Sequence, residues 1–246
     1  MSQHPITLSE ALFTNKKKVP PVAVIGALLD DTKARDASLK LAQNMFKFAA
    51  LNAETKERSA DFDKASGSIG MARRLIRFCR WIPFTASLTK NIFASDPLMI
   101  GVKAIHHIAC IVGCLCEDIT TLDKLKVTSY NVSTFENLQK YATFTEACSG
   151  VALSCLQLKQ QQKDLRSQLQ ALKADPNRDK KEIYKSFLLV HLHTMNAIKW
   201  VCEVVAQSFG LELHSQQQLS IIAAMLSSSN GLYCAALRHL QDQQSK

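Results

Sequence analysis

Apolar residues recur at helical spacing along most of the chain. In residues 33–54, the side chains of Leu39, Ala42, Met45 and Phe46 share one face, at spacings of three and four residues. Similar patterns predict further helices over 66–83, 97–116, 135–172, 183–209 and 219–240. The segment 126–134 has local strand propensity, but it is too short and isolated to found a sheet. The pattern therefore predicts an all-α fold.

Changes in composition divide the chain into regions. We expect a loosely ordered lead (1–31), an amphipathic helical region (32–95), a hydrophobic segment (96–117), a Gln-rich helical middle region (118–182) and a C-terminal helical region (183–246) with its own hydrophobic segment (219–237). Leucines recur at seven-residue spacing in the middle region, at Leu158, Leu165 and Leu172. Two heptads are too few to predict a coiled coil.

Two segments have the length and composition of membrane spans. Pro97–Cys116 is long enough but carries Lys103, His106 and His107, whereas the 19 residues of Leu219–Leu237 carry no charge. Ser227, Ser228, Ser229 and Asn230, at the centre of the second segment, would be costly in lipid unless they bond to helix carbonyls or to another helix. Each segment is equally consistent with a buried core helix.

The segment 66–83 combines arginines with large apolar residues. At about 100° per residue, its four arginines fall in one sector of the helix and the apolar side chains fill the opposite half, with Trp81 near the boundary. Ser66 and Ser68 offer N-cap oxygens, and Pro83 is expected to end or kink the helix. The arginines are Arg73, Arg74, Arg77 and Arg80; the apolar half includes Leu75, Ile76, Phe78 and Ile82.

This helix is consistent with three environments: a membrane interface, a soluble core and a nucleic acid. No acidic residue lies between Asp63 and Asp96, so the helix lacks the ion pairs that usually lace a soluble surface helix. A net charge of +9 predicts an acidic partner, but the chain shows no zinc-finger, RNA-recognition or helix-turn-helix pattern. The sequence therefore favours a helical membrane-associated protein that binds anionic lipid and no nucleic acid.

Three stretches of the sequence also resemble a known family. "KARDASLKLAQNMFKFAA" followed by "ASGSIGMARRLIRFCRWIPF" resembles the N-terminal half of the peroxisomal biogenesis factor 11 family. Arg35-Asp36 and Leu39–Phe48 match its first helix, and Ala72–Phe78 match its second. "SIIAAMLSSSNGLYCAAL" is similar to the closing hydrophobic segment of that family. Length and the His- and Cys-containing first hydrophobic segment are most similar to the glycosomal membrane proteins of trypanosomatids within the family.

The resemblance implies a protein of the peroxisomal or glycosomal membrane that promotes organelle proliferation, elongation and fission. It also implies homo-oligomers and contact with the fission machinery. By position, Arg73, Arg74, Arg77 and Arg80 would contact headgroups, and Leu75, Ile76, Phe78 and Ile82 would insert, beside Trp81 at the boundary. The chain departs from the family at 79–83, where Cys79-Arg80-Trp81 and then Pro83 stand in place of a common Gly-Lys.

The remaining chemistry predicts no enzyme and no cofactor. The chain has no nucleophile-elbow, Walker or dinucleotide-binding motif. His106, Cys110 and Cys114 share a helical face, but three ligands without a fourth in a hydrophobic segment favour packing over zinc. Two alternatives to membrane remodelling stay open: a soluble helical scaffold for partner helices, and a small-metabolite pore lined by Lys103, His106 and His107.

Overall fold

The computed structural model describes residues 31–91, 96–129, 132–174, 181–213 and 215–245. These residues form helices and no strand, which confirms the all-α prediction. The predicted lead lies, except for Asp31, outside the described residues. The helices are α3 (Thr32–Leu51), α4 (Lys56–Ile76), α5 (Trp81–Asn91), α6 (Pro97–Lys124), α7 (Val132–Ala174), α8 (Lys181–Gly210) and α9 (Gln217–Ser245).

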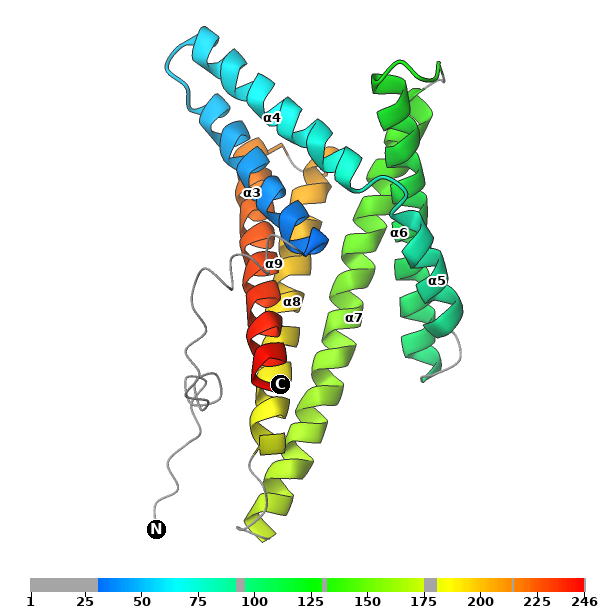
Figure 1. The fold of residues 1–246 in the computed structure, drawn as a ribbon, viewed down its shortest axis with the longest axis vertical. Coiled ribbons are helices and arrows are strands. Elements are labelled where there is room, and N and C mark those ends of the chain that lie inside the picture. Colours follow the sequence, from blue (N-terminus) through cyan, green and yellow to red (C-terminus); the bar gives the residue numbers. More distant parts are fainter. Residues whose placement is uncertain (1–30, 92–95, 130–131, 175–180, 214, 246) are drawn as a thin grey trace.

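The long helix α7 joins the two sides of an elongated bundle (Figure 1). It packs against α6 on one side and against α8 on the other, and α9 lies along α8. Helix α3 packs on α9, and α4 runs obliquely from α3 toward α6, where α5 packs (Figure 1). The segment 32–91 thus crosses from the α8–α9 side to the α6 side, and α4 is the element that makes the crossing.

Helix α4 begins earlier than the sequence predicts. Thr55 is its N-cap, with Oγ1 accepting a hydrogen bond from the N–H of Arg58 at 3.3 Å. The prediction that Ser66 and Ser68 cap a new helix is therefore wrong, because the helix set by Thr55 continues through them. Gly70 lies where a Cβ would meet the side chain of Gln43, so a residue without one permits the close approach of α3 and α4.

The predicted helix 66–83 is also broken in the middle. Helix α4 ends at Ile76 and α5 starts at Trp81. Between them Cys79 has φ 61°, and its N–H donates to Oδ2 of Asp118 at 3.0 Å. Pro83 does not end a helix. It is the third residue of α5, in the first turn, where a missing N–H leaves no helical bond unmade.

The two hydrophobic segments become α6 and α9. Helix α6 continues without a break past residue 117 to Lys124, and the described part of 126–134 contains loop and the start of α7 rather than strand. By length and composition, α6 and the stretch Gln217–Leu240 of α9 are the described helices that could cross a membrane. Most of the α6 window is not buried inside the protein, and about a third of the α9 window is.

Helices α8 and α9 form a conventional apolar interface. Leu188 and Leu192 of α8 pack with Cys234 and Leu237 of α9. The serines of α9 are accommodated as expected: Ser227 donates a hydrogen bond to the carboxylate of Glu203 on α8.

Ser228 donates back to the carbonyl of Ala224, one turn earlier in the same helix. Bonds to another helix and to the helix's own carbonyls therefore satisfy two hydroxyls that would otherwise be costly to bury.

Candidate functional site

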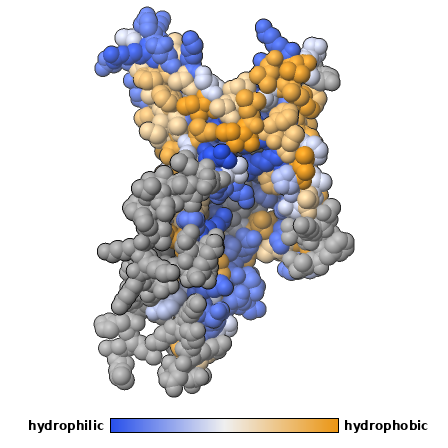
Figure 2. All heavy atoms as spheres, in the orientation of Figure 1, coloured by the Kyte–Doolittle hydropathy of each residue, from blue (hydrophilic) through white to orange (hydrophobic). Residues whose placement is uncertain are grey.

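The apolar residues singled out in 66–83 point away from the bundle. Leu75, Ile76, Phe78 and Ile82 are 50%, 42%, 41% and 52% exposed. Figure 2 shows hydrophobic residues gathered in a band across the upper part of the molecule, where α4 runs in Figure 1. A helix that used this face to complete a soluble core would bury these side chains.

The arginines of the same segment point inward. Arg73 is only 8% exposed. Its Nε lies 3.1 Å from Oδ1 of Asp36 and its Nη1 donates to Oε1 of Gln43 at 2.7 Å, both on α3. Removal from water lowers the pKa of Arg73, and the neighbouring Asp36 carboxylate opposes this shift. Asp36, half of the Arg35-Asp36 pair in the resemblance, is thus a partner of the arginine helix.

Asp36 is shared by three arginines. Besides Arg73, Nε of Arg77 lies 3.6 Å from Oδ1 of Asp36, and Nη1 of Arg80 lies 3.8 Å from its Oδ2. Arg77 also pairs with Oε1 of Glu117 on α6. The Asp36 cluster, meaning Asp36, Arg73, Arg77, Arg80 and Glu117, therefore fastens the end of α4 and the α4–α5 break to two other helices.

Arg74 differs from its neighbours. It lines a polar pocket of about 510 Å³ with residues of α3, α4, α6, α8 and α9, and its Nη1 is buried without a hydrogen-bond partner in the described structure. The same pocket is lined by Lys47, whose pKa is lowered by burial and then by the charge of Arg73. An anionic group entering this pocket would find a guanidinium nitrogen whose bonding capacity is unused.

The segment 66–83 holds the predicted lipid-binding residues in two sets. The apolar set and the boundary residue Trp81 lie within residues 73–82, where α4 ends and α5 begins, which we call the α4–α5 junction. Trp81 is half-buried. Sequence reasoning missed the acidic partners, Asp36 and Glu117, because they lie 37 and 40 residues away from the arginines they contact. The signal available in the sequence was the lack of nearby acids, which left the arginines to find distant partners.

The other candidate residues fall into separate environments. His106 contacts α7 and the ring of Trp200 on α8, whereas His107 bonds to the carbonyl of Lys103 and packs edge-on against Phe84 of α5. Cys110 lies close to His106 and to Glu146 of α7. Cys114, the third member of the predicted ligand set, is not part of that group.

A family model described as peroxisomal biogenesis factor 11 (PEX11) matches residues 23–235. The chain belongs to the PEX11 family. No curated protein and no solved structure matches it.

Membership fixes the general role of the chain. PEX11 proteins are peroxisomal biogenesis factors that act in peroxisome proliferation and fission, and they are not an enzyme family. The chain is therefore a peroxisome-associated protein, and the two long apolar helices α6 and α9 are compatible with a membrane. The match spans α3 through most of α9, so it includes the Asp36 cluster and the outward apolar residues.

Proposed function

We propose that the α4–α5 junction is the surface through which this protein elongates the peroxisomal membrane before fission. One observation carries the proposal: Leu75, Ile76, Phe78 and Ile82 project outward together while the arginines of the same segment are held inside. An outward apolar face next to a half-buried tryptophan suits the boundary between headgroups and acyl chains.

The apolar face supplies most of the attraction to the bilayer. Burying the remaining exposed area of each of these four side chains is worth on the order of 1–2 kcal/mol. An arginine near an anionic surface adds roughly 1 kcal/mol. Because Arg73, Arg77 and Arg80 already share carboxylates, most of the electrostatic gain is committed within the protein. In this proposal, burial of the apolar side chains therefore contributes more to the free energy of membrane binding than the arginines do.

The two sets of arginines take different roles. Arg74 binds a lipid phosphate that enters the polar pocket, because its buried Nη1 has no hydrogen-bond partner in the described structure. Arg73, Arg77 and Arg80 hold the junction in the bent shape that turns the apolar residues outward. This assignment refines the sequence prediction, which gave all four arginines to headgroups.

Helices α6 and α9 anchor the chain in the same bilayer as the junction in this proposal. We also propose that the chain forms homo-oligomers and contacts the organelle fission machinery. The glycosomal membrane is the proposed location within the peroxisome class, on the basis of the His- and Cys-containing first hydrophobic segment.

The test is a double substitution, Leu75→Glu with Ile76→Glu. Both positions are exposed, so the chain should fold and accumulate normally, while two charges on the inserting face cost a few kcal/mol each in lipid. Cells carrying only this variant should contain fewer and larger organelles. Microscopy of organelle shape and immunoblotting of protein abundance measure the two effects separately.

A matched control adds the same two charges elsewhere, as Gln162→Glu with Gln170→Glu on the exposed polar part of α7. This control should leave organelle shape unchanged. Normal abundance of the junction variant with normal organelles would overturn the proposal. Degradation of the junction variant, with a wild-type chain that alkaline carbonate extracts from membranes, would instead support a soluble scaffold in which the junction is covered by partner helices.

A further inference from the structure

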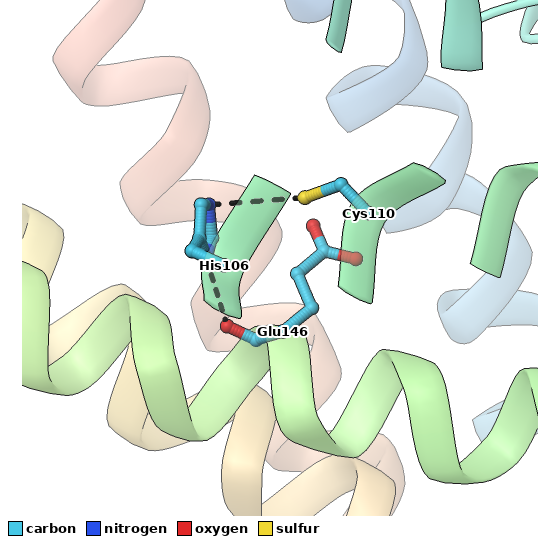
Figure 3. Close-up of side chains that lie close together, drawn as sticks. All are labelled: His106, Cys110 and Glu146. Carbon is cyan, nitrogen blue, oxygen red and sulfur yellow. Dashed lines mark hydrogen bonds between the residues drawn. The ribbon is translucent and has the colours of Figure 1, made fainter. Parts of the chain in front are cut away.

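Three potential metal ligands meet between α6 and α7. His106 and Cys110 lie one turn apart on α6, and Glu146 comes from α7. Their ligand atoms all lie within 4.8 Å of one another. Figure 3 shows the Glu146 carboxylate directed toward Cys110, with the imidazole of His106 on the other side of the thiol.

The hydrogen bonds of His106 leave one ring nitrogen available. Nδ1 lies 3.2 Å from the carbonyl oxygen of Glu146 and 3.1 Å from Oγ of Ser149. Ser149 donates its own proton to the carbonyl of Thr145 at 2.7 Å, so its oxygen accepts from His106. Nδ1 therefore carries the proton, and the lone pair of Nε2 is directed at the group's interior. Metal-binding histidines are held by the same arrangement.

The ligand spacing is close to that of a tetrahedral site. Nε2 of His106 lies 3.8 Å from Sγ of Cys110. Two such ligands at usual zinc bond lengths stand about 3.6 Å apart. Small side-chain rotations of Glu146 would close the rest of the set.

We propose that His106, Cys110 and Glu146 bind a zinc-class divalent cation that joins α6 to α7, with water as the fourth ligand. Binding releases the Cys110 proton to solvent, so the ion, one thiolate and one carboxylate sum to zero charge. A neutral set is the combination that a poorly hydrated site between two helices accommodates at least cost. Nitrogen, sulfur and oxygen ligands together favour zinc over magnesium or calcium.

The surroundings hold the three ligands in place. Cys110 is fully buried, and the ring of Trp200 lies edge-on to His106 with centroids 5.4 Å apart. A side chain at Gly150 would collide with Trp200, so this glycine lets the indole of α8 cover the site. His106 and Glu146 remain half-buried, so two of the three ligands keep part of their surface exposed.

This site differs from the ligand set that the sequence analysis considered and did not favour. Helical spacing grouped His106, Cys110 and Cys114 on one predicted helix, and this group contained no carboxylate. The packing of α6 on α7 replaces Cys114 with Glu146. The proposal is independent of the membrane function, because it rests on the α6–α7 contact alone.

Cobalt titration of the purified full chain tests the proposal. Co²⁺ should give a near-ultraviolet thiolate charge-transfer band with the intense visible bands of tetrahedral cobalt, and Zn²⁺ should remove both. Cys110→Ser should abolish the charge-transfer band, and Glu146→Gln should weaken cobalt binding about tenfold or more. In wild type, but not in Cys110→Ser, Zn²⁺ should raise the thermal unfolding temperature.

Cys155→Ser is the control, because Cys155 is an exposed cysteine of α7 outside the group. It should keep the band at full intensity, and circular dichroism should show that each variant remains helical. A band that survives Cys110→Ser, or that disappears in Cys155→Ser, would overturn the site in favour of adventitious binding at other thiols. No band in the wild-type chain would overturn it as well.

Discussion

The α4–α5 junction and the α8–α9 pair use the same kinds of residue in opposite ways. At the junction, arginines and carboxylates lie inside and Leu75, Ile76, Phe78 and Ile82 lie outside. In the α8–α9 pair, Leu188, Leu192, Cys234 and Leu237 lie inside. Ion pairs thus hold the interior of the junction, whereas apolar packing holds the interface between α8 and α9.

The difference shows what each arrangement leaves for function. A region held by apolar packing has used its hydrophobic surface in folding. The junction instead pairs Arg73, Arg77 and Arg80 with carboxylates and keeps its apolar side chains outside, available to a membrane or a partner. Substitutions that separate these two modes of stabilisation sharpen the comparison.

The largest effect is expected for Asp36→Ala, which would break the junction. It removes the carboxylate shared by three arginines and leaves Arg73 buried without its counterion. Breaking a buried pair in this way costs about 3–5 kcal/mol, and we expect the lower part of that range because Asp36 is not fully enclosed. Denaturant unfolding of purified protein measures the loss.

Asp61→Ala is the control for that measurement, because Asp61 is an exposed carboxylate of α4. Its unfolding free energy should stay within about 0.5 kcal/mol of wild type. Equal stability of the Asp36 variant and wild type would mean that the cluster does not hold the junction.

A smaller loss is expected for Ser227→Ala in the α8–α9 pair. The substitution removes a buried hydroxyl that donates to the Glu203 carboxylate, and hydrogen bonds to charged groups are worth about 2 kcal/mol. Ser229→Ala, at an exposed position two residues away, should change the unfolding free energy little. Similar losses for both variants would show that the bond to Glu203 is not what stabilises this interface.

The same carboxylate predicts a dependence on pH. Burial alone raises the pKa of Glu203, but Lys40 and the hydrogen bonds from Lys40 and Ser227 lower it below its ordinary value of 4.5. Its stabilising contribution is therefore complete above pH 4.5 and is lost as the pH falls further, through the folded-state pKa. Unfolding temperatures of wild type and Glu203→Gln should differ at neutral pH and converge in acid. A gap that stays constant down to strongly acidic pH would contradict this account.

The smallest effect is expected at the outward face. Ile82→Gln places a polar group where the side chain is 52% exposed, so the unfolding free energy should change by about 0.5 kcal/mol or less. Leu192→Gln makes the same exchange in the α8–α9 core and should cost about 2 kcal/mol. Comparable losses at the two positions would show that the junction's apolar residues are already part of a core.

Much of the fold could be predicted from the pattern alone. Helical periodicity located α3, α7, α8 and α9, and their ends lie within a few residues of the predicted ones, because a long amphipathic repeat persists whatever its neighbours are. The requirement that the α9 serines find partners was also correct, since it follows from the cost of burying a hydroxyl. The start of α4 was missed although its N-cap, Thr55, is a local signal. The break after α4 was not predictable, because it depends on a bond from Cys79 to a distant Asp118.

The sequence by itself determined that the segment 66–83 separates arginines from apolar residues, since that separation depends only on residue order and the helical period. Which face lies inside was decided by tertiary structure. Asp36 on α3 and Glu117 on α6 approach the arginines from elements far away in the chain, and a charge removed from water must lie beside an opposite one. With those carboxylates in place, the arginines turn inward and the apolar residues are left on the surface.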